Sequence, residues 1–216
     1  MRDFPIFSTE SGVSSLTLKE IPYKKQAYIQ VQDVQPGALQ EHLRECVQFC
    51  KAAGAEHIFA AGHPELENFP LHTAIWKMQI TAWVDQQKLE NLFPVTEATA
   101  ESWRGHYNRL MAEVDNTATL EARDVPQLYN GAYFVHHQGE LLGIGWLDDT
   151  TLLAVAAVKP GAGERVMHTL MSLVEGAQME LEVASTNTRA VRLYEKLGFL
   201  KTGERSRWYR VDSLLG

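Results

Sequence analysis

Hydrophobic and polar positions alternate along this chain with two periods, and the dominant period changes many times between residues 26 and 211. Period two predicts strands, whereas apolar positions spaced by three and four residues predict amphipathic helices. Strands are expected at 26–34, 56–61, 73–80, 92–97, 132–137, 141–147, 151–158, 179–184 and 207–211. Helices are expected at 38–53, 98–114, 188–197 and after residue 162, with a short helical piece at 120–130. The pattern therefore predicts an α/β chain.

The most informative stretch begins with the strand at 179–184 and continues into a helix. Residues that favour a helix N-cap follow the strand, namely Ser185, Thr186 and Asn187. The apolar positions Ala190, Leu193, Tyr194 and Leu197 then mark one face of the helix. Gly198 stands where a left-handed residue ends a helix, and Phe199 can fold back on the last turn.

The segment Asn187–Phe199 reads N-x-R-A-x-x-L-Y-x-K-x-G-F and resembles the second half of the GNAT superfamily, the acetyl-CoA-dependent N-acetyltransferases. Gly203 and Trp208–Arg210 extend the resemblance, which covers residues 92–211 and is topological at its beginning. It implies the GNAT acyl-CoA N-acyltransferase fold, an α+β mixed sheet. The GNAT domain is expected to span residues 91–216.

The first ninety residues contain a pattern that recurs downstream. Val34–Ala38 (VQPGA) is echoed by Val158–Ala162 (VKPGA), and each stretch precedes a helix. Pro64 and Pro70 leave too little room for a second long helix in the first copy. We therefore expect residues 1–90 to form a degenerate half-repeat of the same fold without its active-site residues, although chance similarity of two strand–turn–helix units is the alternative.

Composition narrows the possible partners and the compartment. The chain has 216 residues, 45% hydrophobic and 22% charged, with a formal net charge of −7. The acidic balance argues against nucleic acid as a partner, and no apolar run approaches the ~18 residues of a membrane span. Two cysteines make no disulfide framework, and the start of the chain lacks a secretory signal. A cytoplasmic monomer or homodimer is expected.

Three residues of the first long helix permit a metal interpretation. His42, Cys46 and Cys50 are spaced by four residues, as ligands on one helix face would be. The same positions continue the apolar face begun by Leu39 and Leu43, and cysteine is among the most buried residue types. A core role is favoured, and no metal is expected.

In GNAT proteins the strand that corresponds to 151–158 parts from the next strand, and the pantetheine arm of acetyl-CoA bonds to the freed backbone. A backbone N–H there polarises the thioester carbonyl. The resemblance assigns these groups to Val155, Ala156, Ala157 and Val158. Their apolar run, TLLAVAAV, by itself predicts a central strand buried on both faces.

The loop after this strand is expected to hold the pyrophosphate. Glycines before a helix expose backbone N–H groups, and the helix dipole attracts anions. Gly161, Gly163, Arg165 and Val166 are assigned to this role, although the loop departs from the family pattern and Glu164 has the wrong charge for an anion. An ordinary glycine turn is the alternative. The resemblance also assigns Asn187 and Ala190 to the cofactor, and Asn187 fits a plain N-cap as well. Arg189 and Lys196 fit either contacts to the nucleotide phosphates or solvated charges on the helix.

Acetyl transfer needs a neutral amine, a stabilised carbonyl oxygen and a proton for the leaving thiolate. The resemblance places Tyr194 beside the cofactor sulfur as the acid, although periodicity alone favours a core aromatic. The base is left open among Glu180, Glu182, His136 and His137. Trp103, His106, Tyr107 and Arg109 could line the acceptor site, but Trp103, Tyr107 and Leu110 also fit a buried stripe.

These observations predict an N-acetyltransferase that moves an acetyl group from acetyl-CoA to a primary amine of a small molecule or peptide, by direct attack. A GNAT-fold module that binds CoA or a protein partner without turnover is the alternative.

Overall fold

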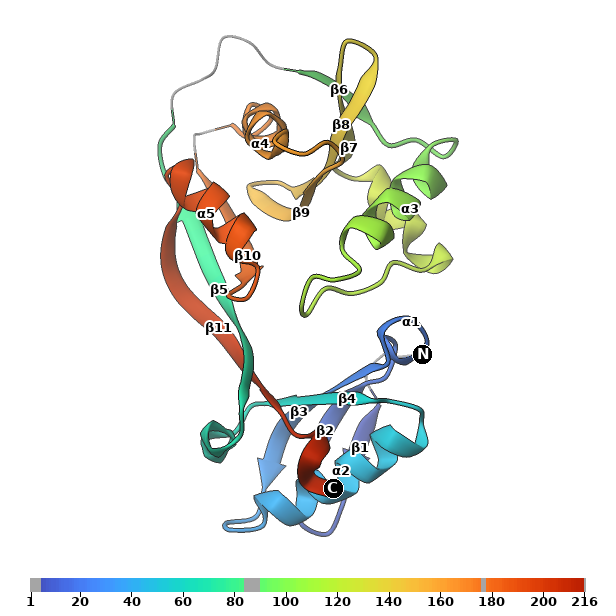
Figure 1. Ribbon diagram of the computed structural model, residues 1–216, viewed down its shortest axis with the longest axis vertical. Helices are drawn as coiled ribbons and strands as arrows, with labels where there is room; N and C mark the ends of the chain where they lie inside the picture. The colour runs from blue at the N-terminus through green and yellow to red at the C-terminus, as the bar shows by residue number, and fades with distance from the viewer. Residues whose placement is uncertain (1–4, 84–89, 176–177, 216) are drawn as a thin grey trace. The chain divides into compact units, whose positions relative to one another are not determined.

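The computed structural model describes residues 5–83, 90–175 and 178–215 (Figure 1). The chain folds as two compact units. The first contains residues Met1–Ile75 and Glu204–Gly216, and the second contains Trp76–Gly203. Two strands, β5 (Leu71–Ile80) and β11 (Leu200–Arg210), contribute residues to both units.

The first unit is a small mixed sheet covered by one long helix. Its strands are ordered β1-β2-β3-β4-β11. The bounds are β1 (Ile6–Ser8), β2 (Gly12–Thr17), α1 (Ile21–Lys24), β3 (Gln26–Val34), α2 (Leu39–Ala52), β4 (His57–Ala61), η1 (Pro64–Asn68) and η3 (Asp212–Leu215). Strands β3 and β4 are parallel, and α2 buries Leu39, Leu43 and Val47 in the core of the unit.

The second unit is a longer sheet with helices on both faces. Its strands are ordered β5-β10-β9-β8-β7-β6. The bounds are β6 (Asn91–Pro94), α3 (Ala100–Leu110), η2 (Ala122–Tyr129), β7 (Ala132–His137), β8 (Glu140–Asp148), β9 (Thr151–Ala157), α4 (Gly163–Met171), β10 (Met179–Ala184) and α5 (Thr188–Lys196). Figure 1 shows α3 and α4 on opposite sides of strands β7–β9, and each side has its own apolar cluster.

The two halves of the chain repeat one order of elements, as the half-repeat prediction requires. An antiparallel pair leads into a strand, a helix and a parallel strand, as β1-β2-β3-α2-β4 and again as β7-β8-β9-α4-β10, and the first copy adds the short α1 between β2 and β3. The next helix, α5, has only the short 3-10 helix η1 as its counterpart. The longer mixed sheet is thus preceded by a shorter copy of the same arrangement, while the predicted boundary between residues 90 and 91 stays a prediction.

Two sequence predictions need correction. The strand at 151–158 is not buried on both faces, because Leu153 is 48% exposed and residues 155–158 are only partly buried. The last strand begins at Leu200 rather than at residue 207. The sequence pattern also does not predict strands β1 and β2. By contrast, His42, Cys46 and Cys50 are fully buried, which confirms their core role.

Candidate active site

Strands β9 and β10 pair only where they begin. Their parallel register contains Glu180 opposite Thr151 and Leu181 opposite Leu152. Within the described ranges, no later part of β9 is in register with β10, although the strands continue to Ala157 and Ala184. Two strands that start as neighbours and then part leave backbone groups of both without a ladder partner.

A β-bulge marks the point where the strands separate. Trp146 of β8 lies opposite Ala154, but the next residue, Leu147, lies opposite Leu152. Leu153 is therefore the extra residue on β9. A bulge bends its strand and increases the local twist, which accounts for the departure of β9 from β10.

Backbone alternation shows which groups of β9 face the opening. The amide of Val158 donates to the carbonyl of Leu142 over 2.7 Å, so position 158 belongs to the bonded pairs of the β8–β9 ladder. Every second residue is bonded to the same neighbour, and Ala156 is therefore bonded toward β8. Val155 and Ala157 direct their N–H and C=O groups away from β8, toward the side where β10 has parted.

The corresponding strands of the first half do not separate. β3 and β4 keep five pairs in register, from Gln26 opposite His57 to Gln30 opposite Ala61. This ladder leaves no room for a ligand between the strands. The first half therefore lacks the opening that the second half has, as predicted for a degenerate copy.

The N-terminus of α4 presents free backbone donors next to this opening. Gly161 has a φ of +81°, which turns the chain into the helix. In the part of the chain that the structure describes, the amides of Gly163, Glu164 and Arg165 have no hydrogen-bond partner, whereas the amide of Val166 donates to Ala162 over 3.0 Å. Three free amides at the positive end of a helix dipole can bind an anion. Val166 has no free amide, and its buried side chain packs on Gly143.

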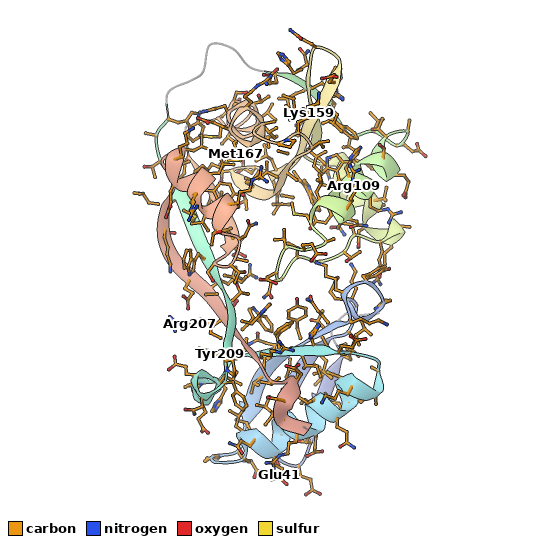
Figure 2. All side chains as sticks on the ribbon, in the orientation of Figure 1. Glu41, Arg109, Lys159, Met167, Arg207 and Tyr209 are labelled. Carbon is orange, nitrogen blue, oxygen red and sulfur yellow. The ribbon has the colours of Figure 1, made fainter. Side chains whose placement is uncertain are left out.

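Three cationic side chains near this helix start are each paired with a carboxylate. Lys159, labelled in Figure 2, bonds to Glu140. Arg165 bonds to Glu90 over 2.5 Å, and Lys196 bonds to Glu164 over 2.5 Å. Arg165 and Lys196 therefore lie near the helix start, and their charges are already compensated.

Tyr194 lies on the face of α5 that packs on the sheet. Its side chain is 7% exposed and belongs to the main apolar cluster, with its ring 5.7 Å from that of Phe199. Burial raises the pKa of the phenol above its ordinary value, so the group stays protonated at neutral pH. Asn187 caps α5, accepting a hydrogen bond from the amide of Ala190 over 3.2 Å.

No family model matches the chain. A stretch of 86 residues is 40% identical to the spore coat polysaccharide biosynthesis protein SpsD of Bacillus subtilis, covering 34% of this chain and 28% of that protein. Another of 52 residues is 39% identical to the N-alpha-acetyltransferase RimI of Mycobacterium tuberculosis, covering 24% of this chain and 33% of that protein. The matched stretches thus span a third or less of either relative.

Solved structures match nearly the whole chain at low identity. A GCN5-related N-acetyltransferase from Anabaena variabilis superimposes with a TM-score of 0.61 and 10% identity, over 96% of this chain and 62% of that one. A tandem GNAT protein from the clavulanic acid biosynthesis pathway superimposes with a TM-score of 0.54 and 12% identity, over 97% of this chain and 83% of that one. This chain has the GNAT fold.

Within the GNAT fold, the base candidates occupy different positions. Glu180 lies in the paired part of β10, where Thr151 donates to it over 3.2 Å. Glu182 follows the last paired residue and is exposed. Because side chains alternate along a strand, it projects from the face opposite Leu181 and Val183. His137 bonds to Glu90 over 2.7 Å and pairs with Glu140 in the β7–β8 ladder, and Glu90 also bonds to Arg165 in the first turn of α4.

Helix α3, which carries the residues that could line the acceptor site, packs its inner face into an apolar core. Trp103 is fully buried, stacks on Tyr107 at 5.6 Å, and donates its indole N–H to the carbonyl of Tyr133. This confirms the buried-stripe interpretation for both aromatics. Arg109 is exposed and forms a hydrogen bond with His106 over 2.8 Å. The two polar residues that could line the acceptor site therefore contact each other.

Two residues, Asp115 and Glu90, make contacts that have no signal in the sequence. Asp115 accepts a hydrogen bond from Thr186 over 2.6 Å, which links the loop after α3 to the residue before Asn187. Glu90 bonds to both Arg165 and His137. These contacts join residues far apart in the chain, where no local pattern can reveal them.

No helix in residues 5–83, 90–175 and 178–215 is long and apolar enough to cross a membrane.

Proposed function

We propose that this protein is an N-acetyltransferase that transfers the acetyl group of acetyl-CoA to a primary amine by direct attack in a ternary complex. The observation that carries the proposal is the parting of β9 from β10 after Leu152. The backbone groups of Val155 and Ala157 can bond the pantetheine arm as an added strand would. The free amides of Gly163, Glu164 and Arg165 suit the pyrophosphate.

We assign one group of the chain to each need of the reaction. A backbone N–H of β9 stabilises the carbonyl oxygen as it gains charge. Glu182 takes the proton of the attacking amine, directly or through water. Tyr194 gives a proton to the leaving thiolate, and the burial that raises the pKa of this phenol also raises that of a thiol beside it.

Binding and turnover test the proposal separately. Saturating acetyl-CoA should raise the melting temperature, since a ligand at 100 times its Kd adds about 2.7 kcal/mol to the stability of the native state. Thiol release with a panel of small amines and peptides then measures turnover. Tyr194→Phe should bind acetyl-CoA normally and lose about 10²-fold in kcat.

Tyr209→Phe is the matched control, because Tyr209 is similarly buried and lies in the first unit. Equal turnover of Tyr194→Phe and wild type would remove this phenol from the mechanism. Absence of stabilisation at millimolar acetyl-CoA would refute the proposal as a whole.

The compensated charges near α4 favour one second candidate, a GNAT-fold module that binds CoA or a partner without turnover. An anion gains less from cations that carboxylates already neutralise. Stabilisation by acetyl-CoA with no thiol release for any amine in the panel would support this candidate.

A further inference from the structure

We infer that Glu90 is the counter-ion of the phosphate site. Its carboxylate pairs with Arg165 in the free protein, and an anionic ligand displaces the carboxylate from the guanidinium. The inference rests on the proposed function and concerns how tightly the same site binds. It assigns a role to a residue outside the GNAT sequence motif.

The contacts of Glu90 show that Arg165 is committed to it. Oε1 accepts from both Nε and Nη2 of Arg165, over 2.8 and 2.5 Å. The Glu90 side chain is 9% exposed, while that of Arg165 is 45% exposed. Burial alone would raise the pKa of Glu90, but hydrogen bonds from Arg165 and His137 outweigh it and lower the pKa. The carboxylate is therefore ionised at neutral pH and neutralises the arginine.

The arrangement lets Arg165 leave while the Glu90 carboxylate keeps a second hydrogen-bond partner. Oε2 of Glu90 is bonded to Nδ1 of His137 over 2.7 Å. An ionised carboxylate that loses its sole partner inside a protein is strongly destabilised. Since Glu90 keeps His137, and its backbone amide is held by Thr169 over 3.2 Å, the exchange of Arg165 from carboxylate to phosphate is reversible.

The other two ion pairs near the start of α4 should affect the affinity of the site less than the Glu90–Arg165 pair does. Lys159 and Lys196 are paired with Glu140 and Glu164, and these four side chains are 40–69% exposed, so solvent screens both pairs. Glu90 has the least exposed carboxylate of the three pairs. Removing its charge should therefore change the affinity of the site most.

Calorimetric titration of the full chain with acetyl-CoA tests the inference. Glu90→Gln should bind acetyl-CoA about 2- to 5-fold more tightly than wild type, the range expected for freeing one partly screened ion pair. Inorganic pyrophosphate should show a similar gain, because it lacks the pantetheine arm and probes the phosphate site alone. Arg165→Gln in the Glu90→Gln background should abolish the gain.

Glu101→Gln is the matched control, since it removes a carboxylate from an ion pair with Arg104 on α3. It should leave both affinities unchanged. Glu90→Asp is a second variant in case the glutamine variant does not fold; its shorter side chain cannot serve both partners, and a smaller gain is expected. Equal or weaker binding by the folded variants overturns the inference while leaving the proposed function intact. Failure of wild type and variants alike to bind acetyl-CoA overturns both.

Discussion

Leu181 of β10 lies opposite Leu152 of β9, and in the described part of the chain this is the last pair in register between the two strands. The proposed binding of the pantetheine arm depends on that early end. Beyond it, alternate residues of β9 turn their backbone groups toward an unpaired side. On the other side the ladder to β8 continues through Ala157, and the amide of Val158 still donates to Leu142.

The first prediction concerns this alternation. Val155→Pro removes an N–H that faces the opening, and a strand conformation at residue 154 suits the residue before a proline. The variant should stay folded and bind acetyl-CoA about 5- to 10-fold more weakly, the loss expected for one hydrogen bond. Ala156→Pro removes an N–H of the β8–β9 ladder and should lower stability by about 1–3 kcal/mol.

Thermal melting and calorimetric titration of both variants check this prediction. If Ala156→Pro weakens binding without loss of stability while Val155→Pro unfolds, the assignment of backbone groups to the two sides of β9 is reversed.

The second prediction separates two carboxylates of one strand. Glu182→Gln should lower kcat/KM at pH 7 by about 10²-fold, because the base that takes the proton of the amine is lost. Its rate should keep rising with pH as more of the amine becomes neutral. Glu180→Gln is the matched control and should keep most of the activity, since Glu180 lies in the paired region beside Thr151. Similar losses in both variants would contradict the assignment.

The third prediction concerns the contact between β8 and α4. A Cβ at Gly145 would lie 2.3–2.9 Å from three side-chain atoms of Leu170, which is fully buried. Gly145→Ala should therefore destabilise the protein by about 1–3 kcal/mol through overpacking. Leu170→Ala also destabilises alone, but the double variant should lose less than the sum, because the two sites share one space.

Gly105→Ala is the control for backbone effects. Gly105 lies inside α3, and a Cβ added there would meet nothing within 4 Å, so alanine should stabilise the helix by about 0.5–1 kcal/mol. Thermal melts of all four variants measure the differences. A neutral Gly145→Ala would show that Leu170 has room to move.

The fourth prediction is a pH dependence of the first unit. His42 is fully buried between the hydroxyls of Thr9 and Ser14, at 2.8 and 2.7 Å. Burial lowers its pKa from the ordinary value of 6.5, only partly offset by Glu45. The unfolded chain therefore binds this proton more readily than the native state does. The stabilisation is complete above about pH 6.5 and is lost as pH falls below that value.

Hydrogen exchange of the α2 amides at pH 7 and pH 5, corrected for intrinsic rates, measures this loss. Protection should fall more in wild type than in His42→Gln, which cannot gain the proton. Equal pH dependence in both proteins would assign the effect to other groups.

Local patterns in the sequence are enough to predict most of the second unit. Alternation and one glycine predict the β7–β8 hairpin, where Gln138 and Gly139 have φ of +50° and +82°. Gly198 adopts a φ of +95° at the end of α5, and Phe199 folds back so that its amide donates to Tyr194 over 2.9 Å. These features depend on neighbouring residues, which is why the sequence reveals them.

Other features have no local signal. The first part of β11 is exposed on both faces, so residues 200–206 lack the period-two pattern of a half-buried strand. The bulge at Leu153 follows from pairing with β8, and TLLAVAAV looks like any buried strand. Glu90 reaches Arg165 across 75 positions of the chain. Contacts of that kind are set by the fold, and a single sequence does not display them.

Strand β11 has a consequence for how the chain is made. Tyr209 lies opposite Ala60 and Arg210 opposite Phe59, so the first unit is completed by residues that are translated long after β4. Pairing across such a long stretch of chain is slow. During translation, the edge of β4 that pairs with β11 stays unpaired with β11 until residues 204–211 leave the ribosome. A separately expressed 1–90 fragment lacks β11, so this edge of β4 would have no β11 to pair with.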